Sequence, residues 1–459
     1  MKPRPRLGPW FFAWSAMIPI ALLRAGTLSE SDTFWGIRTG YLIVDAHALP
    51  VSDSFSWTAF GQPWTLHSWL FNVLLSGADA VGGLMAVAGI AAAVVLLIAA
   101  LQLRLARRMG ARPWMAAALL VAASPLYLEW ISARPQLVDY LGAMLLVLLF
   151  KRSQLTDEPA VVIIWIGLLM VVWTNLHSGS LLGLAMVLAF AVVSLVLSRD
   201  RYRQVVAWMA IVPAALGTLL NPYGLGLFQQ PAAVAGSSTQ LIDEWQRANP
   251  ADPTTLLSLA IGLLALVFAM RRNDLAFTAG LSTSFIAALF VVQALPVLVL
   301  LAIPMLAAAA SQSRARLFVQ RHRVIFLPPA IIGMVAVTLV ALPSATHIGR
   351  PNPDLYPTAL VARIPAGCAL LNPYLLGGYV IMARPDVRVS LDSRNDIYGT
   401  DLLTRATLGL DGQLPLTQAV TSAQCALIPS ASGLAAQLRG STAWKADGHE
   451  GPYALFVRQ

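Results

Sequence analysis

Charged residues are scarce in this chain of 459 residues. They make up 12% of the sequence, against about 25% in soluble domains, whereas hydrophobic residues make up 57% and the mean hydropathy is +0.68. A soluble protein of this length has too little interior to remove that much apolar surface from water. The composition therefore excludes an ordinary soluble protein and indicates helices that span a lipid bilayer.

Cysteine is also scarce, with two residues, Cys368 and Cys425. Each opens a short β-like run, in "CALLNP" and "QCALIP", so adjacent strands could bring the two thiols close enough to form a disulfide in an oxidising compartment. The alternative is a pair of small buried residues without a bond. Of the two interpretations, the sequence favours the unbonded one.

Apolar runs recur through the first three quarters of the chain. A span takes about 20 mostly apolar residues, or fewer where its ends snorkel or the bilayer thins. The basic start resembles a secretory signal peptide, but no A-x-A cleavage site follows, so we expect the first helix to be retained. We predict about eleven transmembrane helices, over residues 9–24, 84–105, 114–131, 136–150, 159–174, 179–197, 204–220, 254–270, 275–292, 294–311 and 324–342.

The basic residues are distributed unevenly between the predicted connections. The start and every second connection hold more than half of the 31 Lys and Arg residues, in "MKPRPR", "RLARRMGAR", "KR", "SRDRYR", "RR" and "SRARLFVQRHR". The alternate connections hold only Arg24, Arg38, Arg134 and Arg247. By the positive-inside rule the N-terminus is cytoplasmic, and everything after residue 343 lies outside the plasma (inner) membrane. The net charge of +9 is thereby explained without a nucleic-acid partner.

The pattern predicts a mainly α-helical, multi-pass protein with two domains. Residues 1–343 form a transmembrane domain, whose first outside loop, 25–80, carries a helix at the membrane surface in "LHSWLFNVLLSGADAVGG". Residues 344–459 form a small extracytoplasmic α/β domain. In that domain we expect short strands in "CALLNP", "GYVIMA", "VRVSLD", "QCALIP" and "YALFVR", and a helix near 431–439.

Polar residues gather in the segments predicted to lie outside. Function in a membrane protein usually resides where polar groups interrupt the apolar average. The convergence predicts a catalytic or binding cleft at the outer leaflet. Its candidate residues are Glu30, Asp32, Asp53, His67, Glu129, Arg134, Gln136, Asp139, Asn175, His177, Asn221, Asp243, Glu244 and Trp245.

Asp32, in "SESDTFW", has two interpretations of equal weight. As a carboxylate near the membrane surface it is the candidate general base for a hydroxyl. Alternatively, Ser31 or Asp32 is the N-cap of a helix that begins before the Phe-Trp pair.

The other acidic and imidazole candidates are weaker. Asp53, in "PVSDSF", is interpreted first as a turn-forming residue and second as a metal or substrate ligand. His67 could ligate a metal, orient a carboxylate or form a hydrogen bond at the interface. Such widely spaced ligands do not make a metal motif, and the sequence leaves a metal site unknown.

Arg134 is the only arginine of its short outside connection. At that depth it needs an anionic ligand or a protein partner, and Glu129 and Asp139 are near in sequence. We favour the anionic ligand, a phosphate at headgroup level.

The remaining candidates are interpreted as substrate-binding groups. Asn175 and His177 would bind or position a substrate, with helix capping as the alternative. Trp245, beside Glu244, could stack on a sugar ring, but an interfacial anchor is favoured. In the tail, "LDSRNDIYG" is interpreted as an Asp-Arg ion pair that closes a turn, and secondarily as a contact of the outer cleft.

Several of these stretches resemble a known superfamily. "SDTFWGIRTGYLI", "ALPVSDSFSWTAFGQPWTLHSWLFNVLL", "ARPQL", "TNLHSG", "NPYG", "EW" and "LLNPYLLGGYV…VRVSLDSRNDIYG" are similar to segments of a largely uncharacterised bacterial group within the GT-C superfamily of polytopic membrane glycosyltransferases. The resemblance touches most of the chain, although each motif is short. It implies a GT-C-like transmembrane bundle.

The resemblance also implies an activity. In that superfamily a carboxylate of the first outside loop is the base, which corresponds to Asp32 with Glu30 nearby, and the donor is a polyprenyl-phosphate sugar. Arg134 or Arg38 would stabilise the leaving phosphate, and Gln136, Asn175, His177, Asn221, Glu244 and Trp245 would contact the substrates. A single inverting displacement would transfer a hexose or pentose to an extracytoplasmic glycan, lipid or protein acceptor.

Two departures from the superfamily matter. The chain has no Asp-x-Asp sequence, and its tail lacks the Trp-Trp-Asp-Tyr-Gly motif of oligosaccharyltransferase catalytic subunits. These departures weigh against N-glycosylation of protein. They also leave a divalent metal open, so the lipid-linked donor is the only cosubstrate that the resemblance implies.

Two other classes of function compete with an enzyme. A lipid or glycan transporter or flippase would show polar residues at mid-span and repeated halves, and the sequence has neither. A scaffold that kept the fold and lost catalysis is the third interpretation, which the sequence does not separate from the first.

Overall fold

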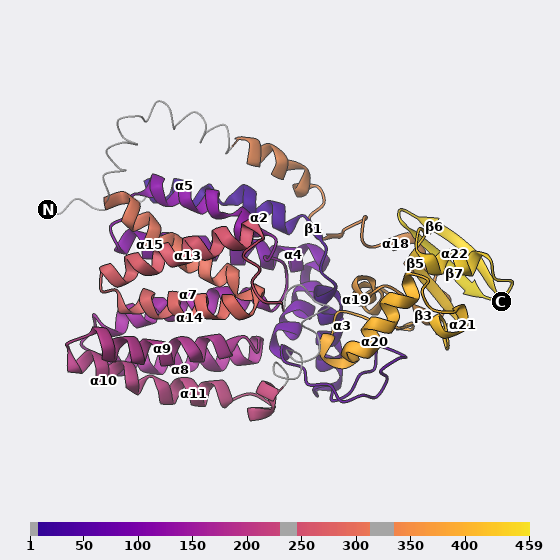
Figure 1. Ribbon diagram of the computed structural model, residues 1–459, viewed down its shortest axis with the longest axis horizontal. Coiled ribbons are helices and arrows are strands. Elements are labelled where there is room, and N and C mark those ends of the chain that lie inside the picture. Colours follow the sequence, from indigo (N-terminus) through magenta and orange to yellow (C-terminus); the bar gives the residue numbers. More distant parts are fainter. Residues whose placement is uncertain (1–7, 230–245, 313–334) are drawn as a thin grey trace. The chain divides into compact units, whose positions relative to one another are not determined.

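A computed structural model describes residues 8–229, 246–312 and 335–459 (Figure 1). Contacts divide the chain into two compact units. The described residues within Met1–Gly26, Ala88–Gly224 and Glu244–Ile348 form the first, here called the helical unit. Those within Thr27–Val87, Leu225–Asp243 and Gly349–Gln459 form the second, the mixed unit. The first-loop residues thus pack with the C-terminal segment, although the sequence grouped them with the membrane helices.

The helical unit consists of α-helices and short 3₁₀ turns among its described residues. α4 (Trp69–Arg108) begins in the mixed unit and ends in the helical unit. The other elements are α1 (Gly8–Ser15), α2 (Ile18–Ala25), α5 (Pro113–Ala123), α6 (Pro125–Leu128), α7 (Gln136–Ser153), α8 (Pro159–Leu176), α9 (Ser180–Leu197), α10 (Arg201–Met209), α11 (Ile211–Leu219), η1 (Gly224–Phe228), α13 (Pro253–Arg271), α14 (Leu275–Phe290), η3 (Val292–Ala294) and α15 (Leu295–Gln312).

Among the described residues, five helices are long and apolar enough to cross a membrane: Trp69–Arg108, Pro159–Leu176, Ser180–Leu197, Pro253–Arg271 and Val292–Gln312. They mark the chain as a membrane protein, but they do not confirm a count of eleven spans. Shorter apolar helices include Pro113–Ala123, Leu275–Phe290 and Val335–Ala345. The first part of the predicted span 324–342 lies outside the described residues.

Prolines explain why three predicted spans are divided. The run 9–24 forms α1 and α2, with a proline in the first turn of α2, and 114–131 forms α5 and α6, where Pro125 opens α6. The run 204–220 forms α10 and α11, and α11 carries a proline near its start. Proline has no amide hydrogen and is tolerated in the first turn of a helix, so it favours a new helix over the continuation of the previous one.

The mixed unit contains a five-stranded sheet in the order β4-β3-β5-β7-β6. β3 (Ala369–Leu371), β4 (Arg388–Val389) and β5 (Cys425–Pro429) are parallel, whereas β7 (Tyr453–Arg458) is antiparallel to β5 and to β6 (Trp444–Glu450). A separate parallel pair joins β1 (Thr27–Leu28) to β2 (Arg350–Pro351). The remaining helices are α3 (Ser31–Ala46), α18 (Thr358–Arg363), α19 (Tyr374–Ala383), α20 (Asn395–Leu410), α21 (Leu416–Ala419) and α22 (Gly433–Arg439).

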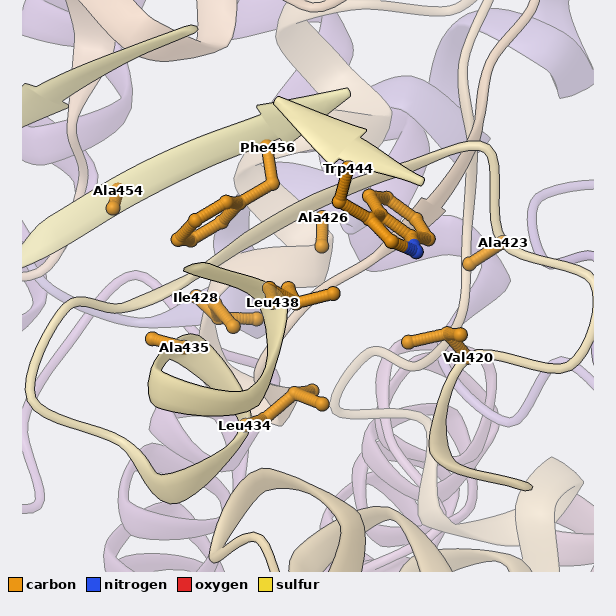
Figure 2. Close-up of a cluster of buried hydrophobic side chains, with 10 residues drawn as sticks. All are labelled: Val420, Ala423, Ala426, Ile428, Leu434, Ala435, Leu438, Trp444, Ala454 and Phe456. Carbon is orange, nitrogen blue, oxygen red and sulfur yellow. The ribbon is translucent and has the colours of Figure 1, made fainter. Parts of the chain in front are cut away.

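An apolar core fixes α22 against this sheet. Ala426 and Ile428 of β5 and Phe456 of β7 face Leu434 and Leu438 of α22 (Figure 2). All five are almost fully buried, and each such side chain contributes roughly 1.5–3 kcal/mol relative to exposure, less for alanine. The helix expected near 431–439 is confirmed, as are strands in "CALLNP", "QCALIP" and "YALFVR".

The run "GYVIMA" is not a strand but the end of α19, so that prediction is wrong. A short apolar run reads the same for a buried strand and a buried helix, because neither shows amphipathic periodicity. Two adjacent glycines let α19 lie directly against its neighbours. A Cβ on Gly377 would stand 2.0 Å from the carbonyl oxygen of Leu391, and one on Gly378 would stand 2.2 Å from that of Ser31.

We expect Gly378→Ala to destabilise the packing of α19 on α3. The added methyl group meets the Ser31 backbone, which cannot move aside as a flexible side chain can, and overpacking of this kind costs about 1–3 kcal/mol. The thermal unfolding of full-length protein in detergent measures the effect. Gly77→Ala is the matched control, because a Cβ there meets no atom within 4 Å. An equal midpoint for the two variants would contradict the prediction.

The first-loop residues extend the sheet at its β4 edge. The Trp57 amide donates to the Val389 carbonyl at 3.0 Å, and the Val389 amide donates to the Phe55 carbonyl at 3.1 Å. The Trp57 indole donates to Leu370 O at 3.0 Å, and the Thr58 hydroxyl donates to Ser390 O at 2.5 Å. A loop and a tail more than 300 residues apart in sequence thus share one sheet.

Cys368 and Cys425 form a disulfide, with 6.3 Å between their Cα atoms. The favoured interpretation of two unbonded residues is therefore wrong. Cys368 directly precedes β3 and Cys425 opens β5, and these strands are neighbours in the sheet, which is the arrangement the alternative required.

The predicted surface helix is the first part of α4. That helix is interrupted at Gly82 and Gly83, whose backbone is non-helical. Gly83 has a φ of 61°, which a residue with a side chain rarely adopts. The helix is confirmed, and its position at the membrane surface stays a prediction.

Candidate functional site

Asp32 lies in the first turn of α3. The helix follows Glu30, whose extended backbone (φ −99°, ψ 119°) makes it the N-cap, although its side chain donates and accepts no capping hydrogen bond. The capping interpretation of Ser31 or Asp32 is therefore wrong. Free amide groups at a helix N-terminus favour a negative charge, so this is a favourable place for an ionised carboxylate.

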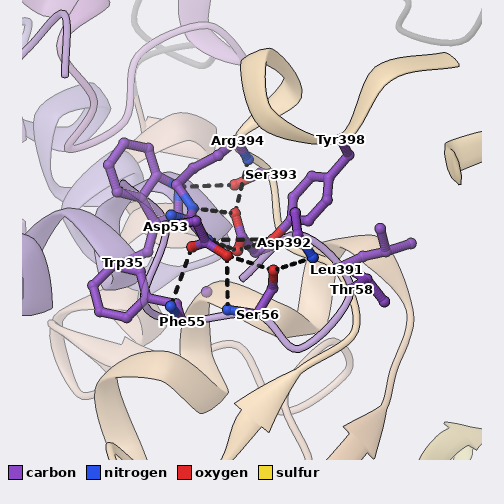
Figure 3. Close-up of polar contacts among 12 residues, drawn as sticks. Trp35, Asp53, Phe55, Ser56, Thr58, Leu391, Asp392, Ser393, Arg394 and Tyr398 are labelled. Atoms are coloured by element: carbon purple, nitrogen blue, oxygen red, sulfur yellow. Dashed lines mark hydrogen bonds and ion pairs between the residues drawn. The ribbon is translucent and has the colours of Figure 1, made fainter. Parts of the chain in front are cut away.

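Two donors hold the Asp32 carboxylate, one of them from the C-terminal segment. The Trp35 indole donates to Asp32 Oδ1 at 3.2 Å, and the Ser393 hydroxyl donates to the same oxygen. The Trp35 indole also lies 3.1 Å from Ser393 Oγ, which closes a triangle of polar contacts (Figure 3). Asp32 stays partly exposed, whereas Trp35 is buried, so the carboxylate is oriented without being enclosed.

A buried ion cluster lies beside Ser393 in sequence. Arg394 Nη2 is 2.6 Å from Asp392 Oδ2 and 2.7 Å from Asp53 Oδ1, and all three side chains are fully buried. Arg394 Nε donates to Asp392 Oδ1 at 2.8 Å, and the Tyr398 hydroxyl donates to Asp392 Oδ2 at 2.5 Å (Figure 3). The Asp-Arg ion pair expected in "LDSRNDIYG" is present.

Asp53 also forms the turn expected from its sequence. Its carboxylate accepts from the amides of Phe55 and Ser56, each at 3.1 Å, and from the Ser56 hydroxyl at 2.5 Å. The same carboxylate is paired with Arg394, which links the first loop to the C-terminal segment. We therefore assign Asp53 a structural role.

Aromatic rings complete the surroundings of Arg394. Its guanidinium carbon lies 4.7 Å from the centre of the Trp64 ring and 4.9 Å from that of Phe55. Burial lowers the pKa of Arg394, but the adjacent Asp392 and Asp53 outweigh burial and hold it well above the ordinary value. Burial, and then the charge of Asp392, raise the pKa of Tyr398 well above its ordinary value. The cluster thus holds one cation, two carboxylates and a neutral phenol.

A tyrosine reports the negative potential at the start of α3. Burial chiefly raises the pKa of Tyr356, and the charges of Glu30 and Asp32 raise it further. The Tyr356 hydroxyl donates to Ser29 O at 2.8 Å, immediately before the two carboxylates. This end of α3 is therefore suited to attract a proton or a cation.

The remaining candidates of the mixed unit do not gather into a metal site. Arg38 lies on α3, six residues beyond Asp32, and His67 precedes α4; both are partly exposed. Within the described ranges, no group of three or more His, Cys, Asp or Glu side chains is arranged to hold a metal. We therefore derive no step through a metal ion.

The helical unit holds the other predicted residues, within itself. His177 Nδ1 lies 2.8 Å from Asp139 Oδ2, and the Trp173 indole donates to Asp139 Oδ1 at 2.7 Å. Asp139 thus pairs with His177, a partner that the sequence did not suggest. Arg134 and Gln136, at the start of α7, are respectively buried and half-buried.

The amides of Asn175 and Asn221 bind backbone carbonyls. Asn175 Nδ2 donates to Val171 O and Leu220 O, both at 2.8 Å. Asn221 donates to Thr218 O at 3.0 Å and accepts from the Tyr223 amide at 2.8 Å, which is the capping and turn role that was the alternative to substrate binding. Glu244 and Trp245 lie outside the described residues.

Sequence reasoning missed Trp35 and Ser393, the two groups that hold Asp32. Trp35 stands three residues after Asp32, one helical turn away, where side chains of a helix meet. Ser393 had a weaker signal, the density of polar residues after a strand in "LDSRNDIYG". The partner of each was visible only once the tail and the first loop were placed together.

The architecture defines a class. A helical membrane unit and a mixed α/β unit built from the first loop and the tail form the fold of polytopic membrane glycosyltransferases of the GT-C superfamily, and solved structures of that superfamily share it with this chain. No protein-family model matches the sequence, and no curated protein sequence matches it.

Particular structures can be named. The oligosaccharyltransferase of Archaeoglobus fulgidus in the apo form aligns with a TM-score of 0.63 and 12% identity, over 93% of this chain and 70% of that chain. The same organism's AglB, in complex with an inhibitory peptide and a dolichol-phosphate, gives 0.64 and 12%, over 92% and 69%. ArnT from Cupriavidus metallidurans bound to undecaprenyl phosphate gives 0.58 and 14%, over 98% of both chains. At these identities the likeness establishes the fold alone.

Proposed function

We propose that this protein is a glycosyltransferase that moves a sugar from a polyprenyl-phosphate donor to an extracytoplasmic acceptor. The observation that carries the proposal is the Asp32 carboxylate, partly exposed at a helix N-terminus and oriented by Trp35 and Ser393. The fold is shared with ArnT, whose solved structure holds undecaprenyl phosphate. A carboxylate held in this way can accept a proton from a hydroxyl group that it contacts.

In the proposed reaction Asp32 takes the proton of an acceptor hydroxyl. The acceptor oxygen forms a bond to the anomeric carbon of the sugar, and the bond from that carbon to the phosphate oxygen breaks on the opposite side. The anomeric configuration is inverted, and polyprenyl phosphate leaves with the electron pair. The leaving phosphate needs no proton donor, but its charge needs a cation, for which Arg134 and Arg38 are our candidates.

The structure-derived roles narrow the candidate list. Asp32 is proposed as the base, with Glu30 adding negative potential, whereas Asp53 is proposed to hold the first loop in place. His177 is proposed as a positioning group through its contact with Asp139. The proposed setting is the plasma (inner) membrane, with a cytoplasmic N-terminus and the mixed unit outside.

Product analysis tests this proposal. Full-length protein in nanodiscs is supplied with polyprenyl-phosphate hexoses or pentoses and with an envelope extract from a strain that lacks the gene, and released polyprenyl phosphate is measured. We expect release that depends on both donor and extract, with a sugar of inverted anomeric configuration on the product. A chain that only moves the donor lipid between leaflets, with no phosphate released from any donor, would overturn the proposal.

A further inference from the structure

A cavity of ≈ 700 Å³ lies between α1 and the C-terminal end of α4, far along the sequence from the residues of the proposed reaction. Both walls belong to the helical unit. The charge pattern of the sequence predicts that this end of α4 faces the cytoplasm. The residues that form the two walls have opposite chemical character.

One wall is aromatic and comes from α1. Trp10, Phe11 and Trp14 line the cavity, and Trp10 and Trp14 are four residues apart, so they share one face of the helix. The Trp14 indole donates to the Leu96 carbonyl at 2.9 Å, which fastens α1 to α4. Phe11 is 59% exposed, so the aromatic wall is only partly covered by protein.

The opposite wall is cationic and comes from the last turns of α4. Arg104, Arg107 and Arg108 line the cavity, at spacings of three and four residues that place them on one side of the helix. All three are exposed. In the part of the chain that the structure describes, none forms an ion pair with a carboxylate, and the Arg107 guanidinium lies 6.0 Å from the centre of the Trp10 ring.

Membrane topology and the helix dipole explain part of this arrangement. Cations at a helix C-terminus interact favourably with the backbone carbonyls, and arginines in a cytoplasmic connection orient the chain. Neither effect requires the arginines to share a cavity with two indoles. Other basic connections, such as that of Arg199, Arg201 and Arg203, serve topology too, and there Arg203 is paired with Asp200 at 3.2 Å.

We propose that this cavity binds the head group of an anionic glycerophospholipid. Guanidinium groups donate paired hydrogen bonds to phosphate oxygens, which neutral or acidic side chains cannot do. Indole rings favour the level of the lipid head groups, with the apolar ring toward the acyl chains. The three arginines supply the charge complement of a phosphodiester, and the aromatic wall supplies the apolar contact. This site is independent of the proposed sugar transfer.

Lipid binding by the purified full-length protein tests the proposal. Detergent-solubilised protein is titrated with phosphatidylglycerol or with zwitterionic phosphatidylcholine, and bound lipid is counted by native mass spectrometry. The test variant is Arg104→Gln/Arg107→Gln/Arg108→Gln. The control is Arg199→Gln/Arg201→Gln/Arg203→Gln, which removes the same charge from another basic connection. All six side chains are exposed, so the substitutions leave the apolar packing in place.

We expect one phosphatidylglycerol to bind more tightly than phosphatidylcholine, and the test variant to lose roughly 100-fold in that affinity, since each basic residue near a lipid surface contributes about fivefold. The control should keep the wild-type affinity. Equal losses in both variants, or equal affinity for the two lipids, would overturn the proposal. Displacement of the lipid by millimolar glycerol phosphate would also contradict it, because it would assign the site to a free phosphate ester.

Discussion

Asp32→Asn is expected to lower the rate of sugar transfer by about 10²–10⁴-fold, the usual contribution of a positioned general base. The amide keeps an oxygen that can accept from Trp35 and Ser393, so the side chain should stay in place while its basicity is lost. Transfer from a polyprenyl-phosphate sugar by purified protein measures the effect, together with the thermal unfolding midpoint, which should be unchanged.

The matched control for that variant is Asp45→Asn. Asp45 lies on the same helix, is exposed, and stands at the opposite end from Asp32. Ser393→Ala should lower the rate by less than Asp32→Asn, because the Trp35 indole still orients the carboxylate, and it should leave the pH dependence of the rate in place. An Asp32→Asn protein that transfers sugar as fast as Asp45→Asn would show that Asp32 is not the base.

Arg394→Met is expected to destabilise the mixed unit by about 3–5 kcal/mol, the cost of breaking a buried ion pair from one side. The substitution leaves Asp53 and Asp392 buried without the guanidinium that lies 2.7 and 2.6 Å from them. Because Asp53 belongs to the first loop and Asp392 to the tail, the expected result is separation of these segments. Thermal unfolding and the rate of trypsin cleavage in the first loop measure it.

An exposed ion pair of the same unit provides the control. Arg363 lies 3.1 Å from Asp447, and the two side chains are 54% and 41% exposed, so Arg363→Met should cost no more than about 1 kcal/mol. Asp53→Asn combined with Arg394→Met should recover part of the stability lost in the single variant, because one uncompensated charge is removed. A single variant Arg394→Met as stable as Arg363→Met would contradict the role given to the cluster.

Local sequence was sufficient for the helices and for three of the strands. Long apolar runs such as 159–174 and 179–197 admit one arrangement in a bilayer, where backbone groups must bond within the segment. The α22 helix and the strands around Cys368, Cys425 and Tyr453 carry turn signals and short apolar runs that fix them locally. "GYVIMA" was assigned wrongly because helix or strand was decided there by packing against Ser31 and Leu391.

The candidate site was only half visible in the sequence. Asp32 could be selected because a carboxylate beside an apolar run is costly unless it has a use. Its donors could not be assigned, since Ser393 is 361 residues away. The same distance hid the pairing of Asp53 with Arg394, so Asp53 was interpreted from its turn alone.

By itself, the sequence determined that this is a helical membrane protein with a small α/β segment at its end, because composition and hydrophobic run length act locally and leave few alternatives. Only the tertiary structure decided that the first loop and the tail form one unit, joined at the β4 edge, at Asp53–Arg394 and at Asp32–Ser393. The physical reason is that buried charges and unpaired strand edges need partners, and the chain supplies those partners from opposite ends.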